Sequence, residues 1–150
     1  MRNYCTIGII VLSIFLGACH KKAMDQTAKP DATDVSESVK SIVVDAQADM
    51  MAIGDVYQVD SLTVNENILS VFVNYSGGCK PHVFDLVSNG MYSKSLPPQI
   101  AVCLKHANNG DACRKLVMRE LKFDISKLKY SGNKTVVVKL GDKEVNYTSK

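Results

Sequence analysis

The sequence contains no tryptophan and has only a small excess of positive charge. Its 18 lysines and arginines against 15 acidic residues give a formal net charge of +3. Nucleic-acid-binding domains usually have a stronger and more clustered basic excess, so this balance argues against a nucleic-acid partner. Without tryptophan, a saccharide site has to use tyrosine or phenylalanine rings. A Ser-His-Asp spacing, a phosphate-binding loop and a nucleotide-binding fingerprint are also missing, so we expect no enzyme and no cofactor.

No apolar run is long enough to cross a bilayer as a helix. The longest follows Arg2 and extends over residues 7–16. It falls short of the roughly 20 apolar residues that a membrane-spanning helix needs. A basic start, a short apolar segment and small residues after it are typical of a signal peptide. We therefore assign residues 1–18 to a signal peptide.

Leu16-Gly17-Ala18-Cys19 follows this apolar segment and resembles the lipobox of bacterial lipoproteins at all four positions. The resemblance implies cleavage before Cys19 and lipidation of its sulfur, which would anchor the domain in the bacterial cell envelope. Several acyl chains suffice for anchoring, because each buried methylene contributes about 0.8 kcal/mol. His20 stands where an aspartate would retain the protein at the inner membrane, so we expect the outer membrane and a domain facing the periplasm. The alternative is an ordinary signal peptide with a chance cysteine.

The rest of the chain divides into a short tether and one domain. Residues 19–35 are mostly Lys, Asp, Ala and Thr, with little to bury, and this composition predicts a flexible tether. We expect residues 36–150 to form a single globular domain. Residues 34–51 fit either an N-terminal helix, with Asp34 and Glu37 as a capping box, or a short strand over residues 42–44.

From residue 55 onward, alternating apolar and polar residues predict about seven short strands. This spacing is typical of an all-β fold, either an antiparallel β-sandwich or a small barrel. The expected strands are residues 56–64, 68–75, 82–88, 99–106, 115–125, 134–140 and 144–147. Asn89-Gly90 and Asn109-Gly110 are typical of hairpin turns.

Three cysteines remain once Cys5 leaves with the signal peptide and Cys19 is lipidated: Cys79, Cys103 and Cys113. An exported domain meets an oxidising compartment, so we expect one disulfide and one free thiol. A two-residue turn at residues 109–110 would place Cys103 and Cys113 about 10 Å apart, which is too far for a bridge. We therefore predict a disulfide between Cys79 and Cys113, which would contribute about 3.5–4 kcal/mol, and a buried, inert Cys103.

A metal site is the alternative use of these residues. Cys79, His82, His106 and Cys113 together supply two sulfur and two imidazole ligands, which suit zinc or copper. Pro81 lies inside the first pair, and exported thiolates tend to oxidise, so we favour the disulfide. Otherwise we interpret both histidines as half-exposed loop residues. Cys103 and His106 are three residues apart on a strand and therefore face opposite sides, which argues against a catalytic pair.

Several surface residues are candidates for contacts with a partner. Tyr92, Tyr130 and Tyr147 could line a contact surface, and we interpret Asp111 and Asp124 as turn residues. Lysines and arginines are dense between residues 105 and 129. In alternating strands such charges form the solvated face, or a patch for anionic glycans, lipid headgroups or an acidic partner.

The segment from Tyr75 to Cys79, with His82 and Phe84 after it, is similar to small lipoproteins of uncharacterised function and to the C-terminal sandwich of the NigD-like lipoproteins. The resemblance implies a β-sandwich and no activity, and this chain has no room for that family's large N-terminal barrel domain. We therefore expect a membrane-anchored, non-catalytic binding or structural protein whose partner is an envelope protein or a glycan. The alternative is a periplasmic inhibitor of a hydrolase such as lysozyme, which would insert the loop of residues 76–81.

Overall fold

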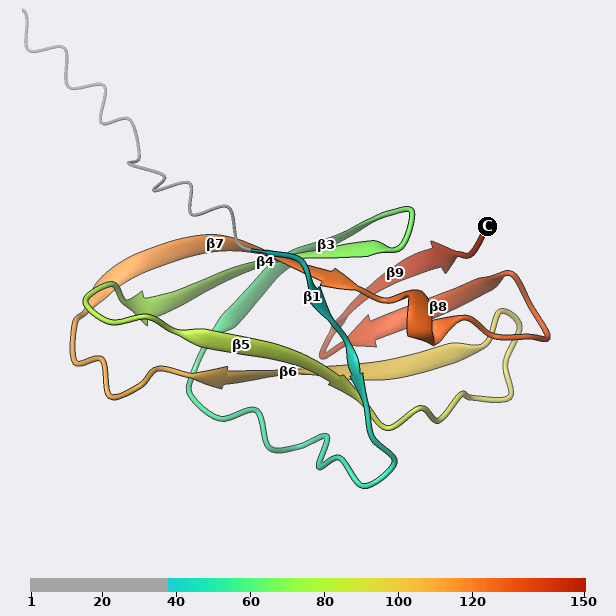
Figure 1. The fold of residues 1–150 in the computed structure, drawn as a ribbon, viewed down its shortest axis with the longest axis horizontal. Coiled ribbons are helices and arrows are strands. Elements are labelled where there is room, and N and C mark those ends of the chain that lie inside the picture. The colour runs from blue at the N-terminus through green and yellow to red at the C-terminus, as the bar shows by residue number, and fades with distance from the viewer. Residues whose placement is uncertain (1–37) are drawn as a thin grey trace, which may run out of the picture. The chain divides into compact units, whose positions relative to one another are not determined.

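The computed structural model describes residues 38–150, which form nine strands in two facing sheets (Figure 1). The first sheet has the strand order β1 (Lys40–Ser41), β7 (Lys115–Asp124), β4 (Ile68–Gly77) and β3 (Gln58–Asn65). The second has the order β2 (Val43–Val44), β5 (Val83–Ser88), β6 (Gln99–Ala107), β8 (Thr135–Leu140) and β9 (Lys143–Thr148). The single helical element in the described region is a 3-10 turn, η1 (Ser126–Leu128). The all-β prediction is confirmed, and the fold is a sandwich rather than a closed barrel.

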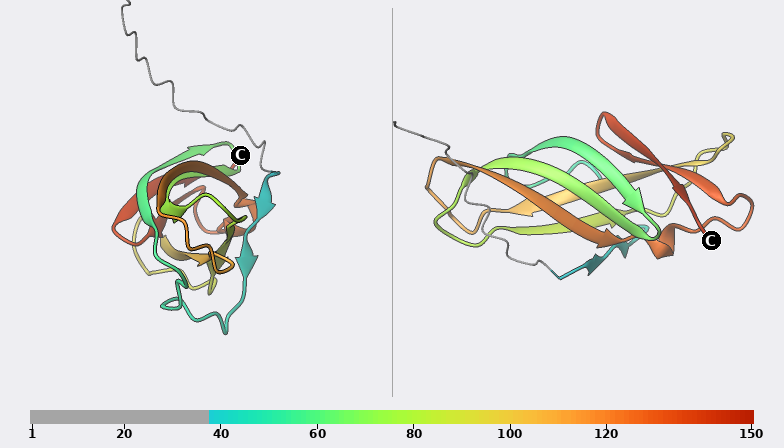
Figure 2. Two further views of the ribbon diagram at one scale, coloured as in Figure 1. Left: turned by 90° about the vertical axis from the view of Figure 1, so that its left-hand side faces the viewer. Right: turned by 90° about the horizontal axis from the view of Figure 1, so that it is seen from above.

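The core lies between the two sheets, which curve around it in the end-on view of Figure 2. In β4, Leu69, Val71 and Val73 are buried and the residues between them are more exposed. Phe84 and Leu104 are fully buried on the second sheet. Burying such a side chain stabilises the fold by about 1.5–3 kcal/mol, so the alternation in the sequence sets which face of each strand points inward.

Both sheets contain parallel pairs, which the predicted antiparallel fold did not include. β6 pairs with β8 in parallel, while β1 and β2 pair in parallel with β7 and β5. The chain leaves the second sheet after β6, runs through β7 in the first sheet, and returns through η1 to β8. Because it reverses direction twice on this path, β8 runs in the same direction as β6.

The expected N-terminal helix is absent from the described part of residues 34–51, and residues 34–37 lie outside the described region. Instead, β1 pairs with the end of β7 and β2 pairs with the end of β5, on opposite sheets. Ile42, between these two strands, is fully buried, and its backbone N–H donates to the carbonyl of Asp124 at 3.0 Å. An extended chain can satisfy the edges of both sheets and fill the gap between them with one side chain, which a helix there could not do.

The predicted hairpin turns at Asn89-Gly90 and Asn109-Gly110 are wrong. β6 and β7 lie in different sheets, so the link of residues 108–114 crosses between sheets. β5 and β6 do pair, but through a long connection of residues 89–98. Asn109 and Gly110 have φ values of 53° and 67°. The Asn-Gly dipeptide therefore correctly indicates left-handed backbone. That conformation occurs both in hairpin turns and in loops that connect two sheets, so it does not identify a hairpin.

Within residues 38–150, no helix has the length and apolar character required to cross a membrane. The expected signal peptide, Cys19 and the tether lie outside the described residues, and they stay predictions.

Candidate functional site

Cys79 and Cys113 form a disulfide with a Cα–Cα distance of 5.9 Å. Cys79 lies just beyond β4 and Cys113 just before β7. The last pair of these antiparallel strands is Gly77 with Lys115, so the two cysteines occupy the next matching position two residues further along each chain. The pair is the one that the sequence favoured, although the hairpin used in that argument does not exist. The bridge instead continues the pairing of β4 with β7.

The Asp111 carboxylate joins the two loops that the disulfide connects. Its Oδ2 accepts the backbone N–H groups of Cys79 at 2.9 Å and Lys80 at 3.0 Å, and its Oδ1 accepts that of Cys113 at 2.9 Å. Asp111 is a turn residue, as predicted, because its backbone N–H donates to the carbonyl of Asn108 at 3.0 Å, but its side chain is only 1% exposed. The Cys113 N–H, followed by the Lys80 N–H, holds the pKa of Asp111 well below its usual value.

His82 and His106 extend this network into the core. Both are buried, at 6% and 4% exposure, and not half-exposed as predicted. His82 Nε2 lies 3.2 Å from Asp111 Oδ2, and His82 Nδ1 lies 2.8 Å from His106 Nε2. His106 Nδ1 lies 3.2 Å from the carbonyl oxygen of Asp55. Asp111, His82, His106 and the Asp55 carbonyl therefore form one continuous hydrogen-bonded chain.

Every ring nitrogen of this hydrogen-bonded chain has a partner. The Asp111 carboxylate and the Asp55 carbonyl can only accept hydrogen bonds, so a ring N–H donor suits each end. Burial lowers the pKa of the His106 imidazole, which favours its neutral form.

Aromatic rings and one glycine fix the positions of the two imidazoles. The Phe84 ring stacks on His106 with centroids 4.2 Å apart and an interplanar angle of 3°. The Tyr75 ring packs on the other imidazole, with its centroid 4.5 Å from that of His82 at an interplanar angle of 30°. A Cβ on Gly77 would lie 2.5 Å from His82 Nε2. Strand β4 extends past its predicted end at residue 75 to Gly77, which still pairs with Lys115 of β7, and the glycine leaves space for the His82 ring.

Two further contacts hold the loops together at the surface. The Lys80 ammonium donates to the carbonyls of Asn109 at 3.3 Å and Gly110 at 2.9 Å, and Asn109 Nδ2 donates to the carbonyl of Pro81 at 2.8 Å. Residues 78–81 are exposed, as are Asn109 and Gly110. We call the loops of residues 78–82 and 108–114 the disulfide end. They present an exposed surface whose backbone is fixed from below by a disulfide and by the buried hydrogen bonds of Asp111.

The four residues of the predicted metal alternative also meet at the disulfide end, but they contact one another directly. The sulfur atoms of Cys79 and Cys113 are bonded together, and the facing nitrogens of His82 and His106 share a hydrogen bond. Asp111 also has a carboxylate oxygen within 4.8 Å of both sulfurs. Zinc and copper bind thiolate sulfur, so a metal ion here would require the disulfide to be reduced. In this arrangement the four residues act as cross-links.

Cys103, the remaining cysteine of the domain, is free and buried on β6. Its side chain faces away from His106, as the spacing on the strand predicted. Met50 and Ile53 line the same shallow pocket as Cys103. Burial raises the pKa of the Cys103 thiol, which disfavours the reactive thiolate.

The predicted tyrosines separate into two groups. Tyr147 is fully buried, and its hydroxyl donates to Asn67 Oδ1 at 2.8 Å. Tyr92 and Tyr130 instead line an open cavity of about 430 Å³ between the loops of residues 89–98 and 129–134. These loops follow β5 and β7, so they lie at the opposite end of the strands from the disulfide, and we call them the tyrosine end.

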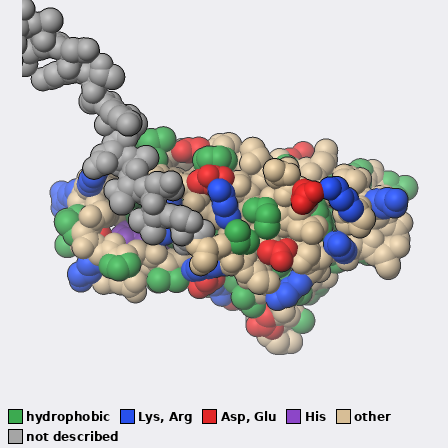
Figure 3. Space-filling view, turned by 45° about the horizontal axis from the view of Figure 1, so that its top comes forward, with side chains coloured by type: hydrophobic (Ala, Val, Ile, Leu, Met, Phe, Trp, Pro, Cys, Tyr) green, Lys and Arg blue, Asp and Glu red, His purple; other side chains and the backbone are tan. Residues whose placement is uncertain are grey.

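The dense basic residues between 105 and 129 do not form a single positive field. Lys122 lies 3.6 Å from the Glu120 carboxylate on β7, and the Lys127 ammonium donates to the carbonyl of Ile42. On the face drawn in Figure 3, positive and negative side chains are interspersed. This favours the interpretation of these residues as a solvated face.

Asp111 and Gly77 are the functional residues that the sequence reasoning missed. Asp111 stands two residues before Cys113, and Gly77 two residues before Cys79. Once the disulfide is assumed, the acidic residue next to one cysteine could have been matched to the glycine-rich turn at the other. An aspartate in a loop is so commonly a turn residue that its burial needs the tertiary structure.

No protein-family model matches the chain, and no curated protein matches it significantly. A solved protein of unknown function from Bacteroides vulgatus aligns at a TM-score of 0.50 with 20% identity, covering 73% of this chain and 55% of that one. A NigD-like immunity protein from Bacteroides caccae aligns at 0.47 with 20% identity, covering 69% and 53%. A toxin-related protein from Parabacteroides distasonis aligns at 0.47 with 16% identity, covering 73% and 58%.

The chain therefore spans little more than half the length of these three structures. A likeness at 20% identity and a TM-score of 0.50 shows a shared β fold alone.

Proposed function

We propose that this protein is a lipid-anchored envelope protein whose β domain binds a macromolecular partner through the disulfide end and catalyses no reaction. The observation behind this proposal is the fixed backbone of the two exposed loops. A disulfide, the Asp111 carboxylate and the Lys80 ammonium all connect residues 78–82 with residues 108–114. A surface that is already ordered loses little conformational entropy on binding, so more of its contact energy appears as affinity.

The buried histidines support a binding role over a catalytic one. An Asp-His pair can activate a nucleophile when the second ring nitrogen faces a hydroxyl or a thiol. Here the second nitrogen of His82 faces His106, whose own second nitrogen faces a backbone carbonyl. Both rings are buried. These hydrogen bonds thus connect the Asp111 carboxylate to the Asp55 carbonyl and leave no reacting group at either end. This is the arrangement of a structural cross-link.

A second candidate function is inhibition of a secreted hydrolase such as a lysozyme. Of the predicted inhibitory loop of residues 76–81, Ser76 and Gly77 belong to β4, and residues 78–81 form the exposed part. These exposed residues favour inhibition, because a rigid loop can enter an active-site cleft without changing its own conformation. The two candidates use the same surface and differ only in the class of partner. Enzyme assays can therefore separate them.

Anchoring is tested by metabolic labelling with radioactive palmitate. We expect the label to enter the wild-type chain and the Cys5→Ala variant, because Cys5 would be removed with the signal peptide. We expect no label in Cys19→Ala, which lacks the sulfur that would accept the lipid. Equal labelling of Cys19→Ala and the wild type would contradict the anchoring proposal.

Partner binding is tested with two substitutions of small or apolar exposed residues. Ala112→Arg places a long side chain on the disulfide end, whereas Leu96→Arg places the same side chain at the opposite end, where Leu96 is 92% exposed. If a lysozyme is the partner, the wild type and Leu96→Arg should slow lysozymes of at least one structural class, and Ala112→Arg should not. Hydrolytic activity of the chain that disappears in His82→Gln would contradict the non-catalytic proposal.

A further inference from the structure

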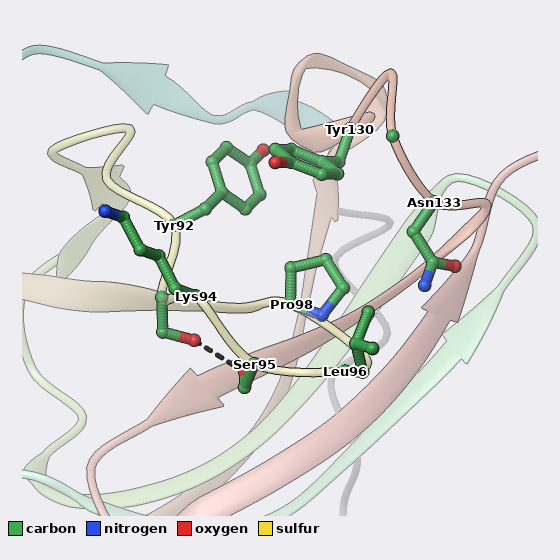
Figure 4. A pocket seen from close by; sticks show the side chains of 9 residues that line it. Tyr92, Lys94, Ser95, Leu96, Pro98, Tyr130 and Asn133 are labelled. Atoms are coloured by element: carbon green, nitrogen blue, oxygen red, sulfur yellow. Dashed lines mark hydrogen bonds between the residues drawn. The ribbon is translucent and has the colours of Figure 1, made fainter.

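The cavity at the tyrosine end is a second surface feature, independent of the disulfide end. Its volume of about 430 Å³ falls within the range of small-molecule sites. Tyr92, Lys94, Leu96 and Pro98 come from the connection between β5 and β6, and Tyr130 and Asn133 come from the connection between η1 and β8 (Figure 4). Two segments that are distant in sequence therefore build one site.

The two tyrosine rings form the aromatic part of this cavity. Their centroids lie 4.9 Å apart at an interplanar angle of 42°, and Figure 4 shows their hydroxyl groups turned toward each other. Tyr130 is 41% exposed. Burial, and then the neighbouring Tyr130, raises the pKa of Tyr92, so its hydroxyl keeps its proton and can donate. The tilted tyrosine rings present an apolar face with polar groups at its edge. Because the rings are not parallel, a flat aromatic ligand cannot stack between them.

The polar side chains around the rings define the charge of a ligand. Asn133 Oδ1 accepts the backbone N–H of Thr135 at 2.9 Å, which orients the amide and leaves its Nδ2 without a partner among residues 38–150. Lys94 is the one charged residue of the lining, and its ammonium has no partner in the same region. The lining contains no acidic residue. Figure 4 shows the Lys94 side chain extending away from the two rings, so its ammonium favours a negative charge at the rim of the cavity, beside hydrogen-bond donors and an aromatic platform.

We propose that the cavity between Tyr92 and Tyr130 binds a saccharide that has a carboxylate. Sugar rings have apolar C–H faces that pack on aromatic rings, and hydroxyl groups at their edges that bond to amides and phenols. The single ammonium of Lys94 suits a carboxylate, since phosphate groups are usually bound by several cations or backbone N–H groups. This site is separate from the surface to which the proposed function assigns the macromolecular partner.

Titrations of the full chain in detergent test this proposal. The probes are glucuronic acid and N-acetylmuramic acid, each compared with its uncharged counterpart, glucose or N-acetylglucosamine. Tyrosine fluorescence reports the binding, because the sequence has no tryptophan to mask it. We expect both acidic sugars to bind more tightly than the neutral ones. Tyr130→Ala should weaken their binding by about tenfold through loss of the platform. Lys94→Gln should lower the affinity for the acidic sugars by about fivefold and leave the affinity for the neutral sugars unchanged.

The controls separate this site from the disulfide end. Tyr130→Phe keeps the ring and should retain most of the binding, while Ala112→Arg should leave saccharide binding unchanged. The substituted Tyr130 and Lys94 side chains are exposed, so the melting temperature should not change. Absence of saccharide binding, equal affinity for acidic and neutral sugars, or unchanged affinity in Tyr130→Ala would each overturn the proposal. None of these results depends on whether the disulfide end binds a protein.

Discussion

The loops at the disulfide end enclose the buried contact between Asp111 and His82, whereas those at the tyrosine end surround an open cavity. Residues 78–82 and 108–114 are joined by a covalent bond, by the Asp111 carboxylate and by two surface contacts. At the other end, the Ser93 and Ser95 side chains bond to each other, to Pro97 and to Gln99 at the start of β6, and none of these bonds reaches the loop of residues 129–134. The same sandwich thus supports one rigid surface and one accessible site, because the two ends differ in what crosses between their loops.

The largest expected effect comes from the disulfide. Cys113→Ala should lower the free energy of unfolding by about 3.5–4 kcal/mol, because the bridge closes a loop between residues 34 positions apart. Denaturant unfolding, with and without a reducing agent, measures the change. The matched control is Cys103→Ala, which should remain as sensitive to the reducing agent as the wild type. A loss below about 1 kcal/mol in Cys113→Ala would show that the bridge adds little to the rigidity of this end.

A pair of glycine substitutions compares the two ends directly. A Cβ on Gly77 would collide with the His82 ring at 2.5 Å, and one on Gly132 with the Tyr130 ring at 2.8 Å. The His82 ring is buried, so Gly77→Ala should cost about 2 kcal/mol in unfolding free energy. The Tyr130 ring is partly exposed and can move aside, so Gly132→Ala should cost less than about 0.5 kcal/mol. Equal costs at the two positions would remove the distinction between a rigid and an adaptable end.

The dependence of stability on pH should show the titration of the disulfide end. The folded-state pKa values of His106 and Asp111 are both lowered, so the unfolded chain binds these protons at a higher pH than the folded chain does. Their stabilisation is present above the ordinary pKa of each group and is lost as the pH falls. Unfolding free energy should therefore decline below pH 6.5, and again below pH 3.8. His106→Asn should lack the first decline, and a wild-type curve that rises on acidification from pH 7 to 5 would contradict the assignment.

The smallest effect is a spectroscopic one. The Asp55 carbonyl can only accept a hydrogen bond, so nitrogen-15 NMR of the folded chain should find a proton on Nδ1 of His106. A His106 ring protonated on Nε2 alone would mean that its contact with the Asp55 carbonyl is not a hydrogen bond.

The sequence predicted the seven longer strands to within a few residues, because the alternation of apolar and polar residues is a local signal. Strand β4, for example, was expected over residues 68–75 and extends over Ile68–Gly77. The sequence also placed Tyr92 and Tyr130 among the contact candidates, and these two residues line the cavity. It did not predict the burial of the His82, His106 and Asp111 side chains, because burial of a polar residue depends on which segments meet around it.

The amino-acid pattern by itself determined the fold class, the inward face of each strand and the three cysteines available to the domain, since these depend on neighbouring residues or on composition. The tertiary structure decided which strands share a sheet. Strand pairing joins residues that are far apart in the sequence, such as Gly77 and Lys115. The alternation of apolar and polar residues is the same whichever strand lies beside it, so it does not identify the neighbouring strand. That choice alone placed Cys79 opposite Cys113 and closed the two loops around Asp111 and the buried histidines.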